Sequence, residues 1–289
     1  MSEEITKNEE ATVTDSKEEV AEVVQENQET EEKETKESTP GSQEQQEENK
    51  EQSEQENQEE KSDENKSVIK VEVRNTVTII GNIDSDVELS HKVHDEGIYR
   101  FTLKVPRIRD GVFDYLIVEL PERGNDINSY HNGDRVKIIG QLRSVNRKSQ
   151  DGKSYHLYLS IFVDEIEHDD STRKVNEIKL IGNVCKKPNK RLTSKGKDIC
   201  DMILAVNRNY GKSDYIPCIT WGRDAKYASE FNAGERFYVV GRVQSRVYKK
   251  KLSETEIVEK TTYEVSVSDI RKLKEDDTVM EDKVVSTGR

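Results

Sequence analysis

Short runs in which apolar and polar residues alternate, rich in Val, Ile and Tyr, recur through the C-terminal part of the chain. A period of two residues is typical of β-strands, because successive side chains point to opposite faces of a sheet. The pattern predicts five strands, at 174–184, 199–206, 214–221, 236–248 and 262–273. It also predicts a short helix at 223–231, just before Gly234.

The same pattern occurs earlier in the chain, as an internal repeat. NTVTIIGNI from Asn75 matches NEIKLIGNV from Asn176, Val105 and Arg107 match Val206 and Arg208, and GDRVKIIGQLRS from Gly133 matches GERFYVVGRVQS from Gly234. Each pair is 101 residues apart. The folded part of the chain is therefore a tandem duplication with few net insertions.

The size of the repeat and its element order predict the fold class. Five strands with a helix between the third and fourth, in about 100 residues, are typical of the OB fold, a small partly open barrel. We therefore predict an all-β protein with two tandem five-stranded OB-fold barrels, each with a short helix, at 67–170 and 171–275. The strand count alone also permits an SH3-like barrel or a small sandwich.

The composition of the two ends of the chain predicts disordered segments. Residues 1–66 hold 24 Asp and Glu against 7 Lys and Arg, a net charge of −17, and no aromatic residue. Such a segment buries too little apolar surface to offset chain entropy, so we predict a disordered acidic tail rich in Glu and Gln. We also expect a short disordered tail at 276–289.

The remaining charge is uneven. Residues 67–170 carry 14 basic and 18 acidic residues, whereas the rest of the chain carries 25 basic and 17 acidic residues. The net charge of −13 for the whole chain therefore conceals a basic second repeat.

Cysteines and hydropathy predict the compartment. Cys185, Cys200 and Cys218 are odd in number and widely spaced, which is typical of reduced thiols rather than of disulfides or a zinc site. The chain has no apolar run of the roughly 18 residues that a membrane span needs. We expect a cytoplasmic, nucleoid-associated protein without a membrane segment, metal or cofactor.

One strand face of the second repeat combines rings and cations. In 236–248, one parity holds Arg236, Tyr238, Arg242, Gln244, Arg246 and Tyr248, and the other holds Phe237, Val239, Val243 and Val247. In 214–221, Tyr215 and Trp221 share a parity, although Pro217 removes a backbone donor between them. Rings beside cations suit single-stranded nucleic acid, because every base offers a face for stacking and every phosphate a charge.

Further cations lie where an OB fold binds oligonucleotides, on its second and third strands and in the loops after strands one and four. We predict contacts to phosphates from Lys186, Lys187, Arg191, Arg208, Lys212, Arg223, Arg242, Arg246, Lys249, Lys250 and Lys251. The alternatives are that basic runs such as Lys249–Lys251 are ordinary solvated surface and that Trp221 packs in the core. The coincidence of these residues on one predicted face favours binding.

In order and spacing, the second repeat resembles the bacterial single-stranded DNA-binding protein family. The resemblance rests on NEIKLIGNV, KPNKRLTSKGKDICDMILAVNR, SDYIPCITWGRDAKYASEF and GERFYVVGRVQSRVY. It implies stacking on bases by Tyr215, Trp221 and Tyr248, and binding of single-stranded DNA without sequence preference in replication, recombination or repair. It also implies that four OB folds act together, as a homodimer of this chain, with replication or repair proteins as partners.

The first repeat departs from the family at the binding positions. Tyr115 keeps the place of Tyr215, but Leu120 and Pro121 stand near the place of Trp221, and Arg147 replaces Tyr248. Gln141 and Val145 replace Arg242 and Arg246. We therefore expect the first repeat to be an assembly partner or a weak binder.

The ends of the chain also differ from the family pattern. Family members usually end in an acidic segment with a hydrophobic tip, whereas this chain ends in VMEDKVVSTGR and carries its acidic segment at the start. We expect that segment to compete with phosphate for the cations, so that deleting residues 1–66 would tighten binding at low salt.

The sequence does not indicate an enzyme. Gly211, Lys212 and Ser213 imitate the end of a phosphate-binding loop, but Val206 stands where that loop needs glycine. His91 and His94 lie in a polar stretch without a third metal ligand nearby. The alternatives to DNA coating are a scaffold or interaction protein, such as a primosome-type accessory factor, and an RNA-binding OB protein.

Overall fold

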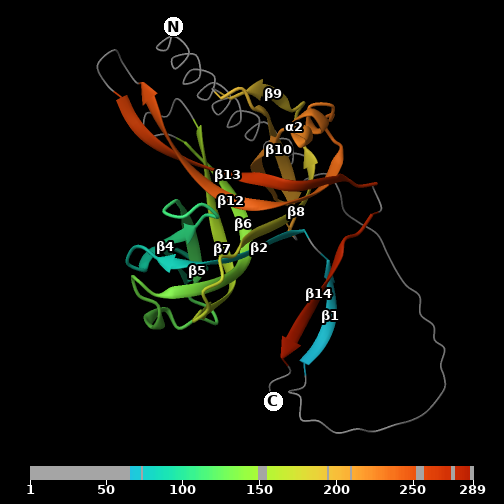
Figure 1. Cartoon of the computed structure of the whole chain (residues 1–289). Helices are drawn as coiled ribbons and strands as arrows, with labels where there is room; N and C mark the ends of the chain where they lie inside the picture. Colours follow the sequence, from blue (N-terminus) through green and yellow to red (C-terminus); the bar gives the residue numbers. More distant parts are fainter. Residues whose placement is uncertain are drawn as a thin grey trace, which may run out of the picture.

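The structure is a computed structural model that describes residues 66–72, 74–148, 155–193, 195–208, 210–251, 257–274 and 277–286. The expected acidic tail, apart from Lys66, lies outside the described residues. The described part is almost entirely β-structure in two similar halves (Figure 1). None of its helices is long and apolar enough to cross a membrane.

The first half is a five-stranded barrel with one extra edge strand. Its strands are β2 (Asn75–Ile83), β4 (Glu96–Pro106), β5 (Phe113–Pro121), β6 (Arg135–Lys148) and β7 (Tyr155–His168). β2 pairs with both β4 and β6, and the parallel pairing of β5 with β7 closes the barrel. The edge strand β3 (Glu88–Val93) pairs with β4, and η1 (Ile127–Ser129) is a single 3-10 turn between β5 and β6.

The second half repeats this arrangement strand for strand. Its strands are β8 (Asn176–Val184), β10 (Asp198–Asn207), β11 (Ser213–Trp221), β12 (Arg236–Lys251) and β13 (Ile257–Lys272), with the short edge strand β9 (Asn189–Leu192) on β10. The helix α2 (Arg223–Ala228) ends three residues earlier than predicted. All five predicted strands are present; the edge strands were not predicted, and the first half has a 3-10 turn instead of an α-helix.

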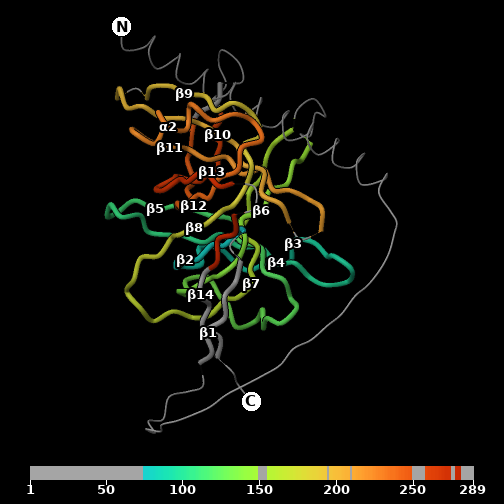
Figure 2. The backbone as a smooth tube through the Cα atoms, turned by 90° about the vertical axis from the view of Figure 1, so that its right-hand side faces the viewer, coloured from blue at the N-terminus to red at the C-terminus, as the bar shows by residue number. Residues whose placement is uncertain are grey.

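The two halves join edge to edge through their first strands. β2 and β8 pair antiparallel, and this joins the barrels into one sheet of 12 strands (Figure 2). Val77 pairs with Ile178, the residue 101 positions later, so equivalent residues of the two repeats face each other. The duplication has therefore produced a local twofold axis inside one chain, between β2 and β8.

Matching side chains strengthen each half in the same way. Asn75 exchanges two hydrogen bonds with the backbone of Leu142, at 2.8 and 3.0 Å, and Asn176 does the same with Val243, at 2.8 and 2.9 Å. A single apolar core cluster includes residues from both barrels, among them Ile138, Leu142, Phe237 and Val243. The barrels are therefore packed as one unit rather than joined by a linker.

Both long hairpins bend at a glycine. In β6 and β12 the register shifts at Gly140 and Gly241, where one residue of the partner strand is left out of the ladder. A Cβ on Gly140 would lie 2.2 Å from the carbonyl oxygen of Phe162, and one on Gly241 would lie 2.5 Å from that of Ser266. Only glycine permits this close approach. Beyond the bend, each hairpin extends towards the other half of the molecule.

The ends of the described chain pair with each other. β1 (Lys66–Glu72) and β14 (Met280–Ser286) form a separate two-stranded antiparallel sheet that projects from the barrels (Figure 1). The sequence pattern did not predict this pairing, because we expected residues 276–289 to form a disordered tail.

Candidate nucleic-acid interface

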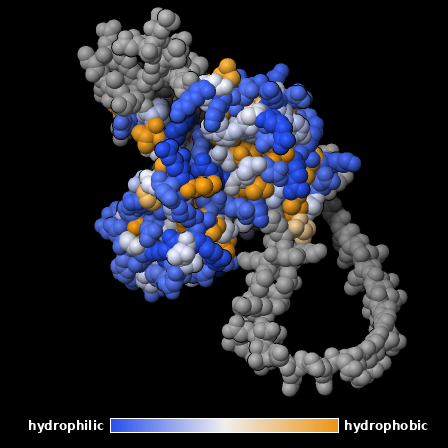
Figure 3. All heavy atoms as spheres, in the orientation of Figure 1, coloured by the Kyte–Doolittle hydropathy of each residue, from blue (hydrophilic) through white to orange (hydrophobic). Residues whose placement is uncertain are grey.

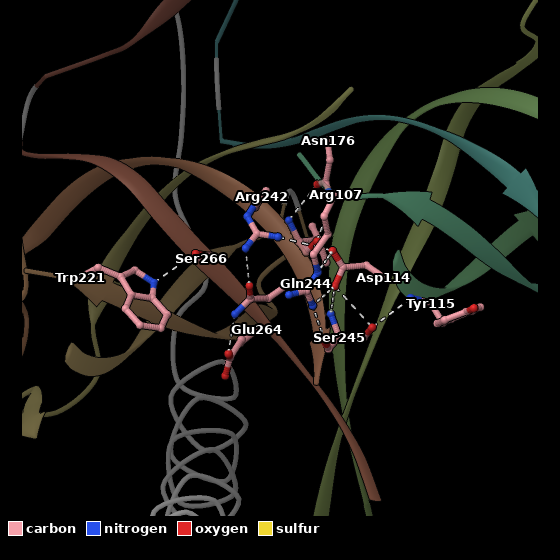
Figure 4. A network of polar contacts seen from close by, with 11 residues as sticks. Arg107, Asp114, Tyr115, Asn176, Trp221, Arg242, Gln244, Ser245, Glu264 and Ser266 are labelled. Carbon is pink, nitrogen blue, oxygen red and sulfur yellow. Dashed lines mark hydrogen bonds and ion pairs between the residues drawn. The ribbon is translucent and has the colours of Figure 1, made fainter. Parts of the chain in front are cut away.

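A buried carboxylate of each barrel is bound by the hairpin of the other barrel. Asp114, with no exposed surface, accepts hydrogen bonds from Arg107 Nε at 2.9 Å and from the backbone amide of Ser245 at 2.7 Å. The Ser245 hydroxyl in turn accepts a hydrogen bond from the amide of Tyr115, at 2.9 Å. Figure 4 shows this contact between β5 of the first barrel and β12 of the second.

The local twofold axis repeats the contact with the roles of the barrels exchanged. Asp214 is paired with Arg208 and accepts a hydrogen bond from the amide of Ser144 at 2.6 Å. The amide of Tyr215 donates to the Ser144 hydroxyl at 2.8 Å, and Arg208 donates to the Ser144 carbonyl at 3.3 Å. The hydrogen bond to Asp214 raises the pKa of Arg208, whose charge is thus held inside the interface.

These contacts change the interpretation of Arg208. The sequence predicted that Arg208 contacts a phosphate, but its guanidinium is engaged by Asp214 and Ser144 at the junction of the barrels. Arg107, its counterpart in the first repeat, is engaged in the same way by Asp114 and Ser245. The structure supports a role for both arginines in joining the barrels.

The predicted stacking residues have different environments. Trp221 is 40% exposed at the end of β11, and its indole Nε1 donates to the hydroxyl of Ser266 at 3.2 Å. Tyr248 is half-buried near the far end of β12. Tyr215 is only 1% exposed, because it packs with Ile203 under Leu157, a residue of the first barrel. In this conformation Tyr215 offers no open face to a base.

A cavity of about 560 Å³ lies between the two barrels and their extended hairpins. From the first barrel, Arg147 and Tyr158 line it, with the guanidinium carbon 5.2 Å from the ring centre. From the second barrel, Lys186, Lys187, Tyr248 and Lys260 line it. On the face seen in Figure 3, apolar residues gather in patches among hydrophilic ones where the two halves meet. The cavity thus combines rings, cations and apolar surface.

The remaining predicted cations are scattered around the second barrel. Lys186 and Lys187 share the cavity wall with Tyr248, whereas Arg191 is paired with Asp201 at 2.6 Å. Lys212 lies exposed in the turn after β10, and the side chain of Arg223 is 97% exposed at the start of α2. The side chains of Lys249, Lys250 and Lys251 lie outside the described part of the structure.

The predicted face of β12 is divided in two by the bend at Gly241. Before the bend, Tyr238 is buried against Ile181, with Arg271 over its ring at 4.7 Å. After it, Arg242 and Gln244 lie in the interface between the barrels, and Arg246 is 3.8 Å from Glu264. Burial lowers the pKa of Arg242, although a guanidinium stays charged. Parity placed Phe237, Val239 and Val243 in the core, as observed, but Val247 of the same face is 60% exposed, and Tyr238 and Gln244 of the opposite face are buried.

Several exposed rings were not included in the sequence prediction. Tyr210 is fully exposed in the turn between β10 and β11. Phe113 and Tyr115 are exposed on β5, with Lys104 of β4 beside both rings. Tyr115 keeps the place of Tyr215 in the first repeat, and Phe113 shares its parity, so the aromatic residues at positions 113 and 115 were a signal in the sequence.

The described residues offer no group of three or more His, Cys, Asp or Glu side chains that could hold a metal ion. The three cysteines are free thiols; Cys200 and Cys218 are buried, and burial raises the pKa of Cys200 to about 11.

Comparison with known proteins matches the second barrel to a family. The model of the single-strand binding protein family matches residues 175–273. Single-stranded DNA-binding protein B of Bacillus subtilis is 31% identical over 83 residues, which are 26% of this chain and 74% of that protein. The chain belongs to the single-strand binding protein family. Members of this family bind DNA without enzymatic activity, so the expectation that the chain is not an enzyme is confirmed.

Other relatives extend the comparison. The single-stranded DNA-binding protein of Enterococcus faecalis is 32% identical over 84 residues, covering 27% of this chain and 45% of that protein. The chain thus spans about half the length of this curated relative. The single-stranded DNA binding protein from Thermus aquaticus, in its wild-type crystal structure, has a TM-score of 0.54 at 18% identity, covering 71% of this chain and 96% of that one. A deletion mutant of the same protein gives 0.55 at 19% identity, covering 70% and 96%. This likeness shows that the fold of the family extends over both barrels.

Proposed function

We propose that the chain binds single-stranded DNA without sequence preference, by stacking bases on exposed rings and neutralising phosphates with nearby cations. The observation that carries the proposal is a partly exposed indole, fixed by a hydrogen bond to Ser266, on a strand that also lines the cavity with its lysines. Trp221 lies on the same face of β11 as Pro217, and Pro217 lines the cavity together with Tyr248, Lys186 and Lys187. The names of the relatives support the same ligand.

The geometry favours an unpaired strand. A ring that is partly exposed and fixed by a hydrogen bond, as Trp221 is by Ser266, loses little freedom when a base stacks on it. Stacking contributes roughly 1–3 kcal/mol per base and is tolerant of sequence, because every base has a π-face. In a duplex the faces of the bases are already stacked, so the same rings cannot reach them.

Within this proposal, the DNA contacts come from Trp221, Tyr248, Lys186 and Lys187, with Lys212 and Arg223 as exposed cations further along the path. Arg191, Arg242 and Arg246 would have to exchange a carboxylate or amide partner for a phosphate, so we expect them to contribute less. We further propose a homodimer with four barrels, acting in replication, recombination or repair together with proteins of those processes.

Fluorescence anisotropy of labelled oligonucleotides tests the proposal. The full chain should bind oligo(dT), should bind a duplex of equal length at least tenfold more weakly, and should lose affinity steeply as salt rises. Equal or tighter binding of RNA of the same length would indicate an RNA-binding protein. Absence of binding to both, with a folded protein, would contradict the proposal and favour a scaffold role.

A further inference from the structure

One end of the first barrel is less covered than the matching end of the second barrel. In the second barrel α2 covers this end, where Ala228 and Phe231 are buried and the ring of Phe231 stacks on that of Phe237 with the ring centres 3.9 Å apart. The first barrel has only the 3-10 turn η1 at this place, and Ile127 and Tyr130 there stay partly exposed. The same end is therefore closed in one barrel and open in the other.

The difference has a local cause in the chain. The amides of Tyr130 and Phe231, 101 residues apart, each donate to the carbonyl three residues earlier. The amides of Glu122 and Gly222 make matching contacts to the starts of β4 and β10, but these two residues are only 100 apart. The segment between the two contacts is thus one residue shorter in the first repeat, and Gly124 within it has a φ of +78°. This left-handed conformation does not continue a right-handed helix, so the first turn of α2 has no counterpart.

A pocket of about 660 Å³, which we call the barrel-end pocket, lies beside η1. Its apolar lining consists of Val87, Tyr99, Ile127 and Tyr130, which are all partly buried and pack against the core. The ring of Tyr130 is held in place because its hydroxyl donates to the carbonyl oxygen of Ile166 at 3.1 Å. The pocket therefore has a preformed apolar floor with two rings.

Carboxylates form the rim of the barrel-end pocket. Asp86, Glu122 and Asp126 line it with exposed side chains, and its lining residues in the described chain include no Lys or Arg. Burial, and to a smaller extent the charge of Asp126, raises the pKa of Tyr130, which places this carboxylate near the ring. The rim therefore attracts cations and repels phosphates.

Gly97 brings one carboxylate and one ring together. A Cβ at this position would lie 2.6 Å from Oε2 of Glu122 and 3.0 Å from Cε2 of Tyr99, so both groups lie over the same backbone atom. The amide of Gly97 donates to Oε2 of Glu122 at 3.0 Å, and a carboxylate has further lone pairs with which to accept from a ligand. A guanidinium can stack on an aromatic face and pair with a carboxylate at the same time.

We propose that the barrel-end pocket binds a basic segment of a partner protein, with an arginine side chain against Tyr99 and Glu122 and an apolar side chain against Ile127. The charge of the rim requires the cation, and the apolar floor favours a peptide over a free polycation. The pocket shares no lining residue with the cavity between the barrels, so the partner can bind while DNA occupies that cavity. The inference goes beyond the proposed function, because it assigns a protein ligand to a different part of the first barrel.

The anisotropy of a labelled octapeptide of alternating Leu and Arg tests the inference in the full chain. The pocket variant, Glu122→Gln with Asp126→Asn, should bind this peptide about 2- to 30-fold more weakly than the unmodified chain, the range for two exposed ion pairs. The control variant, Asp110→Asn with Glu230→Gln, removes the same charge at exposed positions outside the pocket and should keep the affinity. Octapeptides with Gln in place of Arg, or with Gly in place of Leu, should bind the unmodified chain more weakly.

A methyl resonance gives a readout located in the pocket. The δ1 methyl signal of Ile127, assigned by its loss in Ile127→Val, should shift as the Leu and Arg octapeptide is added. The signal of Ile108, which is 94% exposed in the turn between β4 and β5, is the comparison and should not shift. In the pocket variant the shift of the Ile127 signal should be smaller at the same peptide concentration.

The outcomes separate this inference from the proposed function. Equal affinity of the pocket variant and the control variant for the octapeptide, or an unmoved Ile127 signal, would overturn the inference. Equal binding of the Gly and Arg peptide would indicate a site for polycations and would also overturn it. The pocket variant should bind oligo(dT) as tightly as the unmodified chain, and weaker binding would place the pocket on the DNA path instead. Failure of the unmodified chain to bind oligo(dT) would contradict only the proposed function.

Discussion

The carboxylate of Asp114 accepts a hydrogen bond from the backbone amide of Ser245, 131 residues later in the chain, at 2.7 Å. Asp214 and Ser144 repeat the contact at 2.6 Å with the barrels exchanged. Each barrel therefore contributes a buried acceptor to the hairpin of the other. The two OB folds form one rigid platform because of these reciprocal contacts and the pairing of β2 with β8.

Removing one of these carboxylates should destabilise the whole molecule. Asp114→Ala leaves Arg107 and the amide of Ser245 without their buried acceptor, and breaking a buried charge pair typically costs about 3–5 kcal/mol. Urea denaturation should show this loss in the free energy of unfolding. Asp110→Ala removes an exposed carboxylate four residues away and should change stability by less than about 0.5 kcal/mol. Equal stability of the two variants would contradict the role of Asp114.

Uncovering Tyr215 should make the second barrel a better binder. Leu157→Thr introduces the residue found at the matching position of the other hairpin, and it should expose the ring that Leu157 covers. We expect affinity for oligo(dT) to rise by about fivefold or more, with a stability loss of about 1 kcal/mol. Anisotropy and urea titrations measure the two effects. An exposed residue, Leu192, provides the control substitution Leu192→Thr. Unchanged or weaker binding would show that Tyr215 has no part in stacking.

The cavity lysines should determine the salt dependence of binding. For single strands, each neutralised phosphate contributes about −0.7 to the slope of log K against log salt. The double variant Lys186→Ala with Lys187→Ala removes two such contacts, so the slope should become less steep by about 1.4. The same titration of Lys226→Ala, on α2, should reproduce the slope of the unmodified chain. If the double variant kept the full slope, the DNA path would not pass these lysines.

Acid should weaken the turn before β12. Hydrogen bonds from Lys272 and from the amide of Asn232 hold the pKa of the Glu235 carboxyl below its usual 4.5. A lowered folded-state pKa contributes stability above the unfolded-state pKa and loses it as the pH falls through the folded-state pKa. Glu235→Gln should therefore lower the melting temperature at pH 7 but make no difference well below pH 4. Glu230→Gln, at an exposed position nearby, serves as the comparison, and a pH-independent effect of Glu235→Gln would contradict the pairing.

Most of the fold could be predicted because its signals are local. The two-residue period located the strands, and the recurring offset of 101 residues divided the chain into two units. The pairing of Val77 with Ile178 follows from that duplication but needed the structure, because nothing local to either strand determines which edge meets which. The β1–β14 sheet was missed for the same reason, since its strands come from opposite ends of the chain.

The site was predicted less well, because contacts between the barrels decide it. Parity placed Tyr215 and Trp221 on one face, but it could not show that Leu157 of the other repeat covers Tyr215 while Trp221 stays 40% exposed. Charge alone also could not show that Asp214 holds the guanidinium of Arg208, whereas Lys186 and Lys187 lie in the cavity wall. Tyr115, which stands in the place of Tyr215 in the first barrel, is 42% exposed.

The emission of Trp221, the single tryptophan of the chain, tests the central claim most directly. Titration of the full chain with oligo(dT) should quench this emission to a saturating level, at a stoichiometry that matches anisotropy and with a midpoint that moves to higher concentration as salt is added. Unchanged emission while the oligonucleotide is bound would mean that the strand does not stack on Trp221, and this account of the binding surface would then be wrong.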